Sequence, residues 1–140
     1  MTDQPVPFHP TGLFAGLSDD DLEAIGRVGS PVTFSEGAVV FASGDEGDAM
    51  YVITDGEAKV NVGGRFHVMK VGEVFGEMAL LAPGKRMATV EAGTALSALR
   101  IPAEAFQDFL LDHPRAALSI MKQLVVRLRE VEQRIDAWMA

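Results

Sequence analysis

The chain has no cysteine in its 140 residues, which excludes disulfide bonds, thiolate nucleophiles and cysteine-ligated metal sites. It also lacks long apolar runs, because no stretch approaches the roughly 20 residues that a membrane-spanning helix requires. Basic residues are few, with 12 lysines and arginines against 20 acidic residues and a formal net charge of −8. General nucleic-acid binding needs a basic surface, so we expect neither a nucleic acid nor a membrane as a direct partner.

Signals for targeting, metal binding and catalysis are scarce as well. The first residues show neither the basic region nor the apolar region of a signal peptide, so we expect a cytoplasmic protein. His9, His67 and His113 lie far apart in the sequence and match no metal-ligand spacing. No Ser/His/Asp arrangement and no pair of catalytic carboxylates is visible. We therefore predict a protein that is not an enzyme and that holds no metal or cofactor.

The residues that are present indicate one folded domain with its own core, since 48% of them are hydrophobic. Three prolines make residues 1–12 a loose arm, and residues 13–140 form the domain. Ser18 is expected to cap a short helix, and short β-type runs alternate with glycines over about 32–101. We predict an α+β, mainly β fold. It is an antiparallel β-barrel or jelly roll, flanked by a short N-terminal helix and two C-terminal helices over about 102–140.

Two glycine-containing turns organise the middle of the predicted barrel. Asp55-Gly56 predicts a β-hairpin, because both turn positions tolerate a positive φ. Gly63-Gly64 predicts a second turn, which precedes a run from Phe66 to Val71. Between the two turns apolar and polar residues alternate, as in a half-buried strand.

The longest helix is predicted to begin at His113-Pro114, because the residue before a proline disfavours helix. Its apolar residues repeat at alternating spacings of four and three, which is the a/d pattern of a coiled coil. Packing on the chain's own barrel is one interpretation, but the length of this pattern favours a homodimer that shares it. The coiled-coil seam is formed by Ala117, Met121, Leu124, Leu128, Val131, Ile135 and Trp138.

Glu77 and Arg86 carry the strongest functional signal. Gly76 precedes Glu77, and eight residues separate Glu77 from Arg86. The arginine fork suits an anion, and glycine lets the backbone approach a ligand closely. The carboxylate would repel a phosphate, so it should face a hydroxyl group. This pattern favours a nucleotide-like ligand with one compact charge, and the alternative is a Glu77–Arg86 salt bridge across a surface turn.

The ordered set of motifs resembles the cyclic nucleotide-binding domain family, which includes bacterial catabolite activator proteins, protein kinase A regulatory subunits and cyclic nucleotide-gated channels. The resemblance covers nearly the whole chain. Phe75 to Leu81, together with Arg86 to Val90, is similar to the family's phosphate-binding cassette. Further matching motifs are Leu13 to Ser18 with Leu22, Glu36-Gly37, Gly44 to Asp48, Met50 to Ile53, and Gly56.

The resemblance implies a role for each matching residue. Glu77 would accept the ribose 2′-hydroxyl, Arg86 would pair with the cyclic phosphate, and Arg127 would pair with the ribose-binding glutamate or stay solvated. The base would rest against barrel side chains. The residues implied for ligand binding are Gly76, Glu77, Met78, Ala79, Arg86, Met87 and Ala88 in the cassette, Val60, Val62 and Phe66 on the barrel, and Arg127 on the last helix.

Three positions depart from the family pattern. Met87 stands where cGMP-selective relatives carry a hydroxyl. The absence of that hydroxyl favours cAMP over cGMP, and the alternative is that the methionine side chain crowds the site. Val131 and Glu132 stand where the catabolite activator resemblance implies hydroxyl residues that contact adenine, so the resemblance does not extend to base recognition by that route.

The resemblance implies a stand-alone cyclic nucleotide sensor that repositions its C-terminal helices and acts on an unidentified effector protein. The alternative is a fold kept for protein interaction or dimerisation without nucleotide binding, because a fold does not determine a function.

Overall fold

The computed structural model describes residues 12–78 and 84–139, with side chains up to Gln133. The chain begins with a 3-10 helix, η1 (Gly12–Phe14), and helix α1 (Asp19–Val28), and it ends with helices α3 (Ala103–Asp112) and α4 (Pro114–Met139). Eight strands lie between them: β1 (Ser30–Phe34), β2 (Val39–Phe41), β3 (Ala49–Asp55), β4 (Ala58–Val62), β5 (Arg65–Met69), β6 (Val74–Phe75), β7 (Thr89–Ala92) and β8 (Leu96–Pro102).

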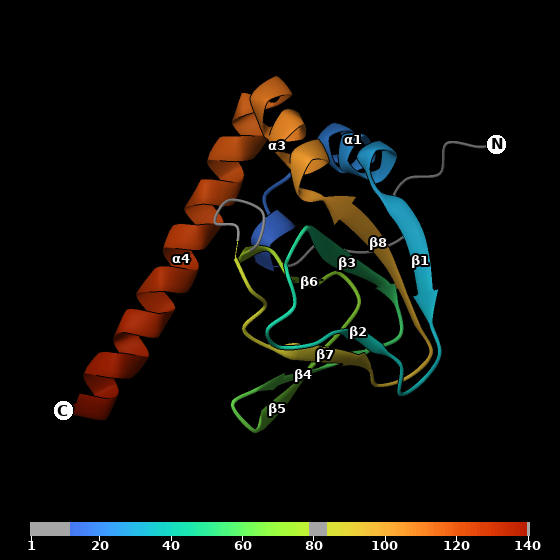
Figure 1. Ribbon diagram of the computed structural model, residues 1–140. Helices are drawn as coiled ribbons and strands as arrows, with labels where there is room; N and C mark the ends of the chain where they lie inside the picture. Colours follow the sequence, from blue (N-terminus) through green and yellow to red (C-terminus); the bar gives the residue numbers. More distant parts are fainter. Residues whose placement is uncertain (1–11, 79–83, 140) are drawn as a thin grey trace.

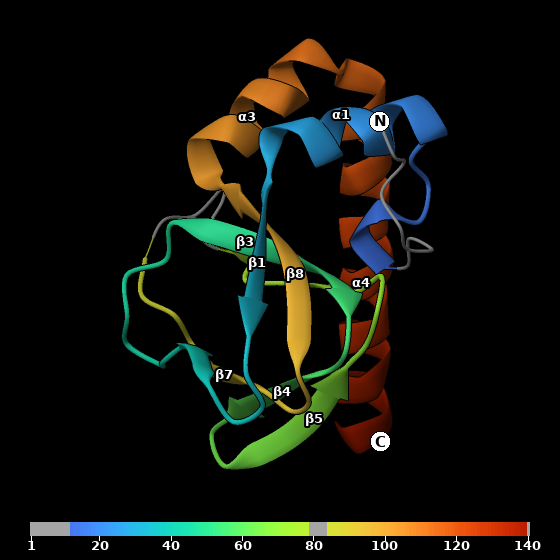
Figure 2. The ribbon, with the colours of Figure 1, turned by 90° about the vertical axis from the view of Figure 1, so that its right-hand side faces the viewer.

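The strands form two antiparallel sheets that face each other. One sheet has the order β1-β8-β3-β6 and the other the order β2-β7-β4-β5. Figures 1 and 2 show the helices α1 and α3 at one end of this barrel, with α4 descending along one side. The predicted jelly roll with flanking helices is confirmed.

The two glycine turns behave differently. Gly63 and Gly64 both have positive φ, of 58° and 84°, and join the paired strands β4 and β5 in a tight hairpin. At Asp55-Gly56 only the glycine has a positive φ, of 81°. The hairpin predicted there is wrong, because β3 pairs with β6 and β8 whereas β4 pairs with β5 and β7. This turn instead carries the chain from one sheet to the other.

Two apolar cores follow from the alternation of side chains along β3. Met50 and Val52 are fully buried under the helices, in a cluster that includes Phe14, Ile25 and Phe106. The intervening residues Tyr51 and Ile53 point between the two sheets and pack with residues such as Phe75, Val60 and Val90. Strand β3 is therefore apolar on both faces, which is why five of its seven residues are buried.

Local sequence signals set the ends of the helices. The Ser18 hydroxyl accepts a hydrogen bond from the backbone N–H of Asp21 at 3.2 Å and caps α1, as predicted. At the other end of the fold, α3 stops at Asp112 and α4 begins at Pro114. The break predicted at His113-Pro114 is therefore confirmed.

The face of α4 that carries the seam is not covered by the barrel. Ala116 and Ile120 are buried against the fold, whereas the seam residues Met121, Leu128 and Val131 are 55%, 57% and 46% exposed. Leu124 is 36% exposed, and the side chains of Ile135 and Trp138 lie outside the described residues. The helix thus docks through one face and leaves the seam exposed from Met121 to Val131, whereas Ala117 at its start is half-buried.

Candidate ligand-binding site

A cavity of about 410 Å³ lies between the β2-β7-β4-β5 sheet, the segments around β6 and residues 84–88, and α4. Ligand pockets commonly start at about 300 Å³, so the cavity can hold a small organic ligand. It is lined by Phe41, Val60, His67, Met69, Val74, Phe75, Gly76, Glu77, Met78, Gly84, Lys85, Arg86, Met87, Ala88, Val90 and Arg127.

Arg86 stands at one end of this cavity and is only 8% exposed. Its two terminal nitrogens donate to backbone carbonyls, Nη2 to Ala49 at 2.6 Å and Nη1 to Gly76 at 3.1 Å. Its Nε is buried and has no hydrogen-bond partner among the described residues. The guanidinium carbon also lies 4.0 Å from the centroid of the Phe41 ring, in cation–π geometry.

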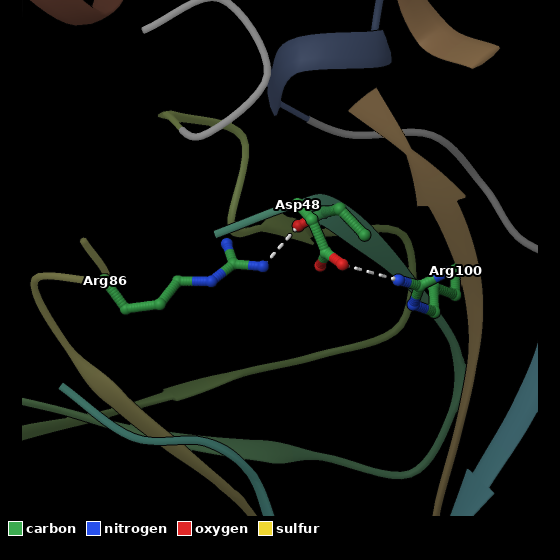
Figure 3. A network of polar contacts seen from close by, with 4 residues as sticks. Asp48, Arg86 and Arg100 are labelled. Atoms are coloured by element: carbon green, nitrogen blue, oxygen red, sulfur yellow. Dashed lines mark hydrogen bonds and ion pairs between the residues drawn. The ribbon is translucent and has the colours of Figure 1, made fainter. Parts of the chain in front are cut away.

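The electrostatic surroundings leave this cation poorly compensated. Burial lowers the pKa of the Arg86 guanidinium, while Tyr51, Asp48 and Asp45 oppose that shift. Within the part of the chain that the structure describes, no carboxylate forms a salt bridge with Arg86. In Figure 3 the carboxylate of Asp48 pairs with Arg100, at 3.3 Å, whereas the Nη2 of Arg86 donates to the Ala49 carbonyl and not to this carboxylate. An anion in the cavity would therefore supply a charge partner that the described residues do not provide.

Gly76 lets the arginine adopt this position. Its φ is +80°, and a Cβ atom there would stand 2.7 Å from Arg86 Nη1 and 3.2 Å from the Ala49 carbonyl oxygen. Both the backbone conformation and the space therefore require glycine. The sequence argument for close backbone approach agrees with this geometry, although the group that approaches here is Arg86 itself.

Replacing Gly76 by alanine is expected to reduce both stability and ligand affinity. A left-handed φ costs a non-glycine residue about 1–2 kcal/mol, and the new methyl group displaces Arg86. We expect a destabilisation of about 2–3 kcal/mol and a loss of ligand affinity of about tenfold or more. Urea unfolding and calorimetric titration measure the two effects. Gly37→Ala is the matched control, since its φ of +85° is also positive but its Cβ would meet open space, and its backbone N–H donates to the carbonyl of Ala92 and not to that of Arg86. Equal affinity loss in both variants would contradict this explanation.

Glu77 pairs with α4 and not with Arg86. Arg127 Nη1 donates to Glu77 Oε1 at 2.9 Å, and the side chains of the pair are 38% and 22% exposed, respectively. The alternative of a Glu77–Arg86 salt bridge is not what the structure shows. The pair that the resemblance implied for Arg127 is present, and it ties the end of β6 to the last helix. This pair uses one carboxylate oxygen of Glu77, and the second oxygen has no hydrogen-bond partner among the described residues.

The wall formed by β4 and β5 differs from the prediction in one respect. Val60 is 6% exposed and lines the cavity, as expected, but Val62 and Phe66 do not line it. Phe66 pairs with Asn61 and lies on the outer face of the hairpin, where Lys59 Nζ stands 4.9 Å from its ring centroid. The structure thus places Phe66 outside the cavity, one residue before His67, because neighbouring strand residues point to opposite faces.

The structure brings most of the predicted cassette residues together around the cavity. Gly76, Glu77, Met78, Arg86, Met87, Ala88 and Arg127 all line it, whereas Ala79 lies outside the described residues. Met78 and Met87 are 67% and 71% exposed at its mouth. Sequence reasoning missed several lining residues, above all Phe41 beneath Arg86 and His67 and Met69 on β5.

Two features are absent from the part of the chain that the structure describes. No group of three or more histidine, aspartate or glutamate residues there could hold a metal ion. No helix there is both long and apolar enough to cross a bilayer.

Comparison with known proteins identifies the class of the fold and the site. The cyclic nucleotide-binding domain family matches residues 31–113, which is more than half of the chain. The chain belongs to this family. Among solved structures it resembles the N-terminal domain of a transcriptional regulator from Streptomyces coelicolor, with a TM-score of 0.77 and 31% identity, over 90% of this chain and 94% of that one. Thermus thermophilus catabolite activator protein gives a TM-score of 0.80 and 27% identity, over 92% of this chain and 63% of that one.

Curated relatives are longer proteins of several kinds. The chain is 27% identical to a CRP-like cAMP-activated global transcriptional regulator of Mycobacterium tuberculosis, over 89% of this chain and 58% of that protein. It is 35% identical to glutaminase 1 of Bradyrhizobium diazoefficiens, over 89% of this chain and 22% of that protein. It is also 35% identical to a cyclic nucleotide-gated potassium channel of Rhizobium etli, over 82% of this chain and 32% of the channel. The chain thus spans between about a fifth and three fifths of these relatives.

Proposed function

We propose that this protein is a regulatory sensor that binds a cyclic nucleotide, with cAMP as its preferred ligand, and that it is not itself an enzyme. The observation that carries this proposal is the Arg86 guanidinium, which is 8% exposed, lacks a carboxylate partner among the described residues and stands at the end of a mostly apolar cavity. A single cyclic phosphate supplies the missing negative charge.

The remaining parts of the cavity match the other parts of such a ligand. The Glu77 carboxylate accepts the ribose 2′-hydroxyl, and Arg127 holds this carboxylate in place from α4. Met87 at the cavity mouth offers no hydroxyl to a guanine, which favours cAMP over cGMP. The cAMP-activated regulator among the relatives supports the same choice.

The Glu77–Arg127 pair also provides a physical link from the ligand to the last helix. Suppose that α4 has two positions and that a ligand at Glu77 binds more tightly when α4 is in one of them. The ligand then shifts the equilibrium toward that position by the ratio of its affinities for the two states. We propose that this shift is the signal, and that an effector protein or a second copy of the chain receives it. A cytoplasmic location remains a prediction.

A homodimer through α4 is the second part of the proposal. Met121, Leu124, Leu128 and Val131 repeat at coiled-coil spacing, and all four are at least 36% exposed in the single chain. These four seam residues are all apolar, and the barrel leaves them exposed. An apolar a/d stripe of this kind pairs with an identical stripe, so a second copy of the chain is the occupant that we propose.

Calorimetric titration of the wild-type chain tests the proposed ligand. We expect one site per chain for cAMP, weaker binding of cGMP, and no binding of 5′-AMP, whose phosphate is not cyclised onto the ribose and carries more charge. Nucleotide recovered after incubation should be unchanged, since the protein is not expected to hydrolyse it. Absence of cAMP and cGMP binding up to about 1 mM, which corresponds to roughly −4 kcal/mol, would contradict the proposal.

The same experiment separates the alternative function. The exposed seam of α4 fits an interaction module that has lost nucleotide binding as well as it fits a sensor. A stable dimer by light scattering, combined with no heat on titration, would favour that alternative.

A further inference from the structure

One row of side chains crosses all four strands of the sheet that forms the floor of the cavity. Phe41 on β2 is opposite Val90 on β7, Val90 is opposite Val60 on β4, and Val60 is opposite His67 on β5. All four residues line the cavity. With neighbouring strands about 4.8 Å apart, this row extends for about 14 Å.

The two ends of the row are polar and its middle is apolar. Arg86 covers the Phe41 ring at one end, with its guanidinium carbon 4.0 Å from the ring centroid. Val90 and Val60 occupy the middle and are 1% and 6% exposed. His67 lies at the other end and is exposed. An anion placed at Arg86 therefore determines in which direction the rest of a ligand extends along this floor.

The polar side chains of the cavity are unevenly distributed. Glu77, Lys85, Arg86 and Arg127 all belong to the cassette or to α4. From β4 and β5 the described cavity wall receives Val60, Met69 and His67, of which only the histidine can form side-chain hydrogen bonds of ordinary strength. If the sugar lies at Glu77, the heterocycle attached to it extends over Val90 and Val60 and reaches the imidazole of His67.

We propose that His67 is a specificity-determining residue that contacts the base of the bound nucleotide. This inference rests on the proposed function and adds the residue that reads the base. Neutral imidazole offers one donor and one acceptor. Adenine and guanine present different donor and acceptor patterns on their edges, so a contact with one imidazole discriminates between them. The apolar floor contributes affinity for adenine and guanine alike, and the contact with His67 makes the affinities for the two bases differ.

Calorimetry on variants of the full chain tests this assignment, with cAMP and cGMP as the two probes. We expect His67→Leu to weaken cAMP binding about three- to tenfold, the effect of one hydrogen bond, and to change the ratio of the two affinities at least about threefold. His67→Gln, whose amide keeps a donor and an acceptor, should recover part of the wild-type ratio. Phe66→Leu is the matched control, because Phe66 is the preceding residue on the outer face.

The outcomes distinguish this inference from the proposed function. If the wild type binds cAMP and an Arg86 variant does not, but His67→Leu keeps both affinities and their ratio, the assignment of His67 is wrong and the proposed function stands. Equal losses in His67→Leu and Phe66→Leu would also overturn it, since they would indicate a general effect on the hairpin. If the wild type binds neither nucleotide, both proposals fail together.

Discussion

Replacement of Arg86 by alanine is expected to lower the affinity for cAMP by about 100-fold or more. An arginine fork can make two charge-assisted hydrogen bonds to a phosphate, and each such bond contributes roughly 1.5–3 kcal/mol. In the structure its terminal nitrogens donate to the carbonyls of Ala49 and Gly76, so a ligand phosphate has to compete with two backbone acceptors. Calorimetric titration of the variant with cAMP and cGMP measures the loss.

Two further variants separate ligand binding from folding. Arg86→Lys keeps the charge but loses the planar fork, and we expect an intermediate loss of affinity. Arg115→Ala removes an exposed arginine in the first turn of α4, outside the cavity, and should leave the affinity unchanged. Thermal unfolding without ligand shows whether Arg86→Ala is folded. A folded Arg86→Ala variant that binds cAMP as tightly as the wild type would refute the phosphate role.

The second large effect is expected on the oligomeric state. Leu124→Lys combined with Leu128→Lys should convert a dimer into a monomer, with a loss of dimer affinity of about 1,000-fold or more. The two substitutions remove four leucines from the paired seam, each of which contributes roughly 1.5–3 kcal/mol when buried. Sedimentation velocity over a range of protein concentrations measures this change.

Val126→Lys provides the matched control for the seam. Val126 lies on the same helix and is 44% exposed, but it falls outside the a/d pattern. A charge there should leave the dimer intact. A monomeric wild type at about 100 μM, or equal disruption by Val126→Lys, would show that α4 does not pair through this seam.

The position of His67 shows how a small error in register changes a predicted site. The hairpin at Gly63-Gly64 has two turn residues, so Val62 must pair with Arg65, and Val60 with His67. Counting back from the turn would therefore have placed His67 on the face of Val60. Phe66, which the resemblance implied beside the base, is one residue away, and a shift of one residue moves a strand side chain to the opposite face.

The hairpin expected at Asp55-Gly56 was wrong for a different reason. The dipeptide does form a turn, and Gly56 has the positive φ that the sequence suggested. However, partners of a strand depend on contacts between residues far apart in the sequence, such as those of β3 with β8. Local turn chemistry cannot distinguish a hairpin from a crossing between two sheets.

The sequence by itself determined the local signals: the capped α1, the break before Pro114, the hairpin at Gly63-Gly64 and the spacing of Glu77 and Arg86. These follow from backbone preferences and side-chain chemistry that act over a few residues. Only the tertiary structure decided which groups meet. It paired Glu77 with Arg127, some 50 residues away, and placed Arg86 over Phe41 without a carboxylate partner among the described residues. These contacts arise where two sheets and α4 converge, because burial and strand pairing join distant segments that no local pattern relates.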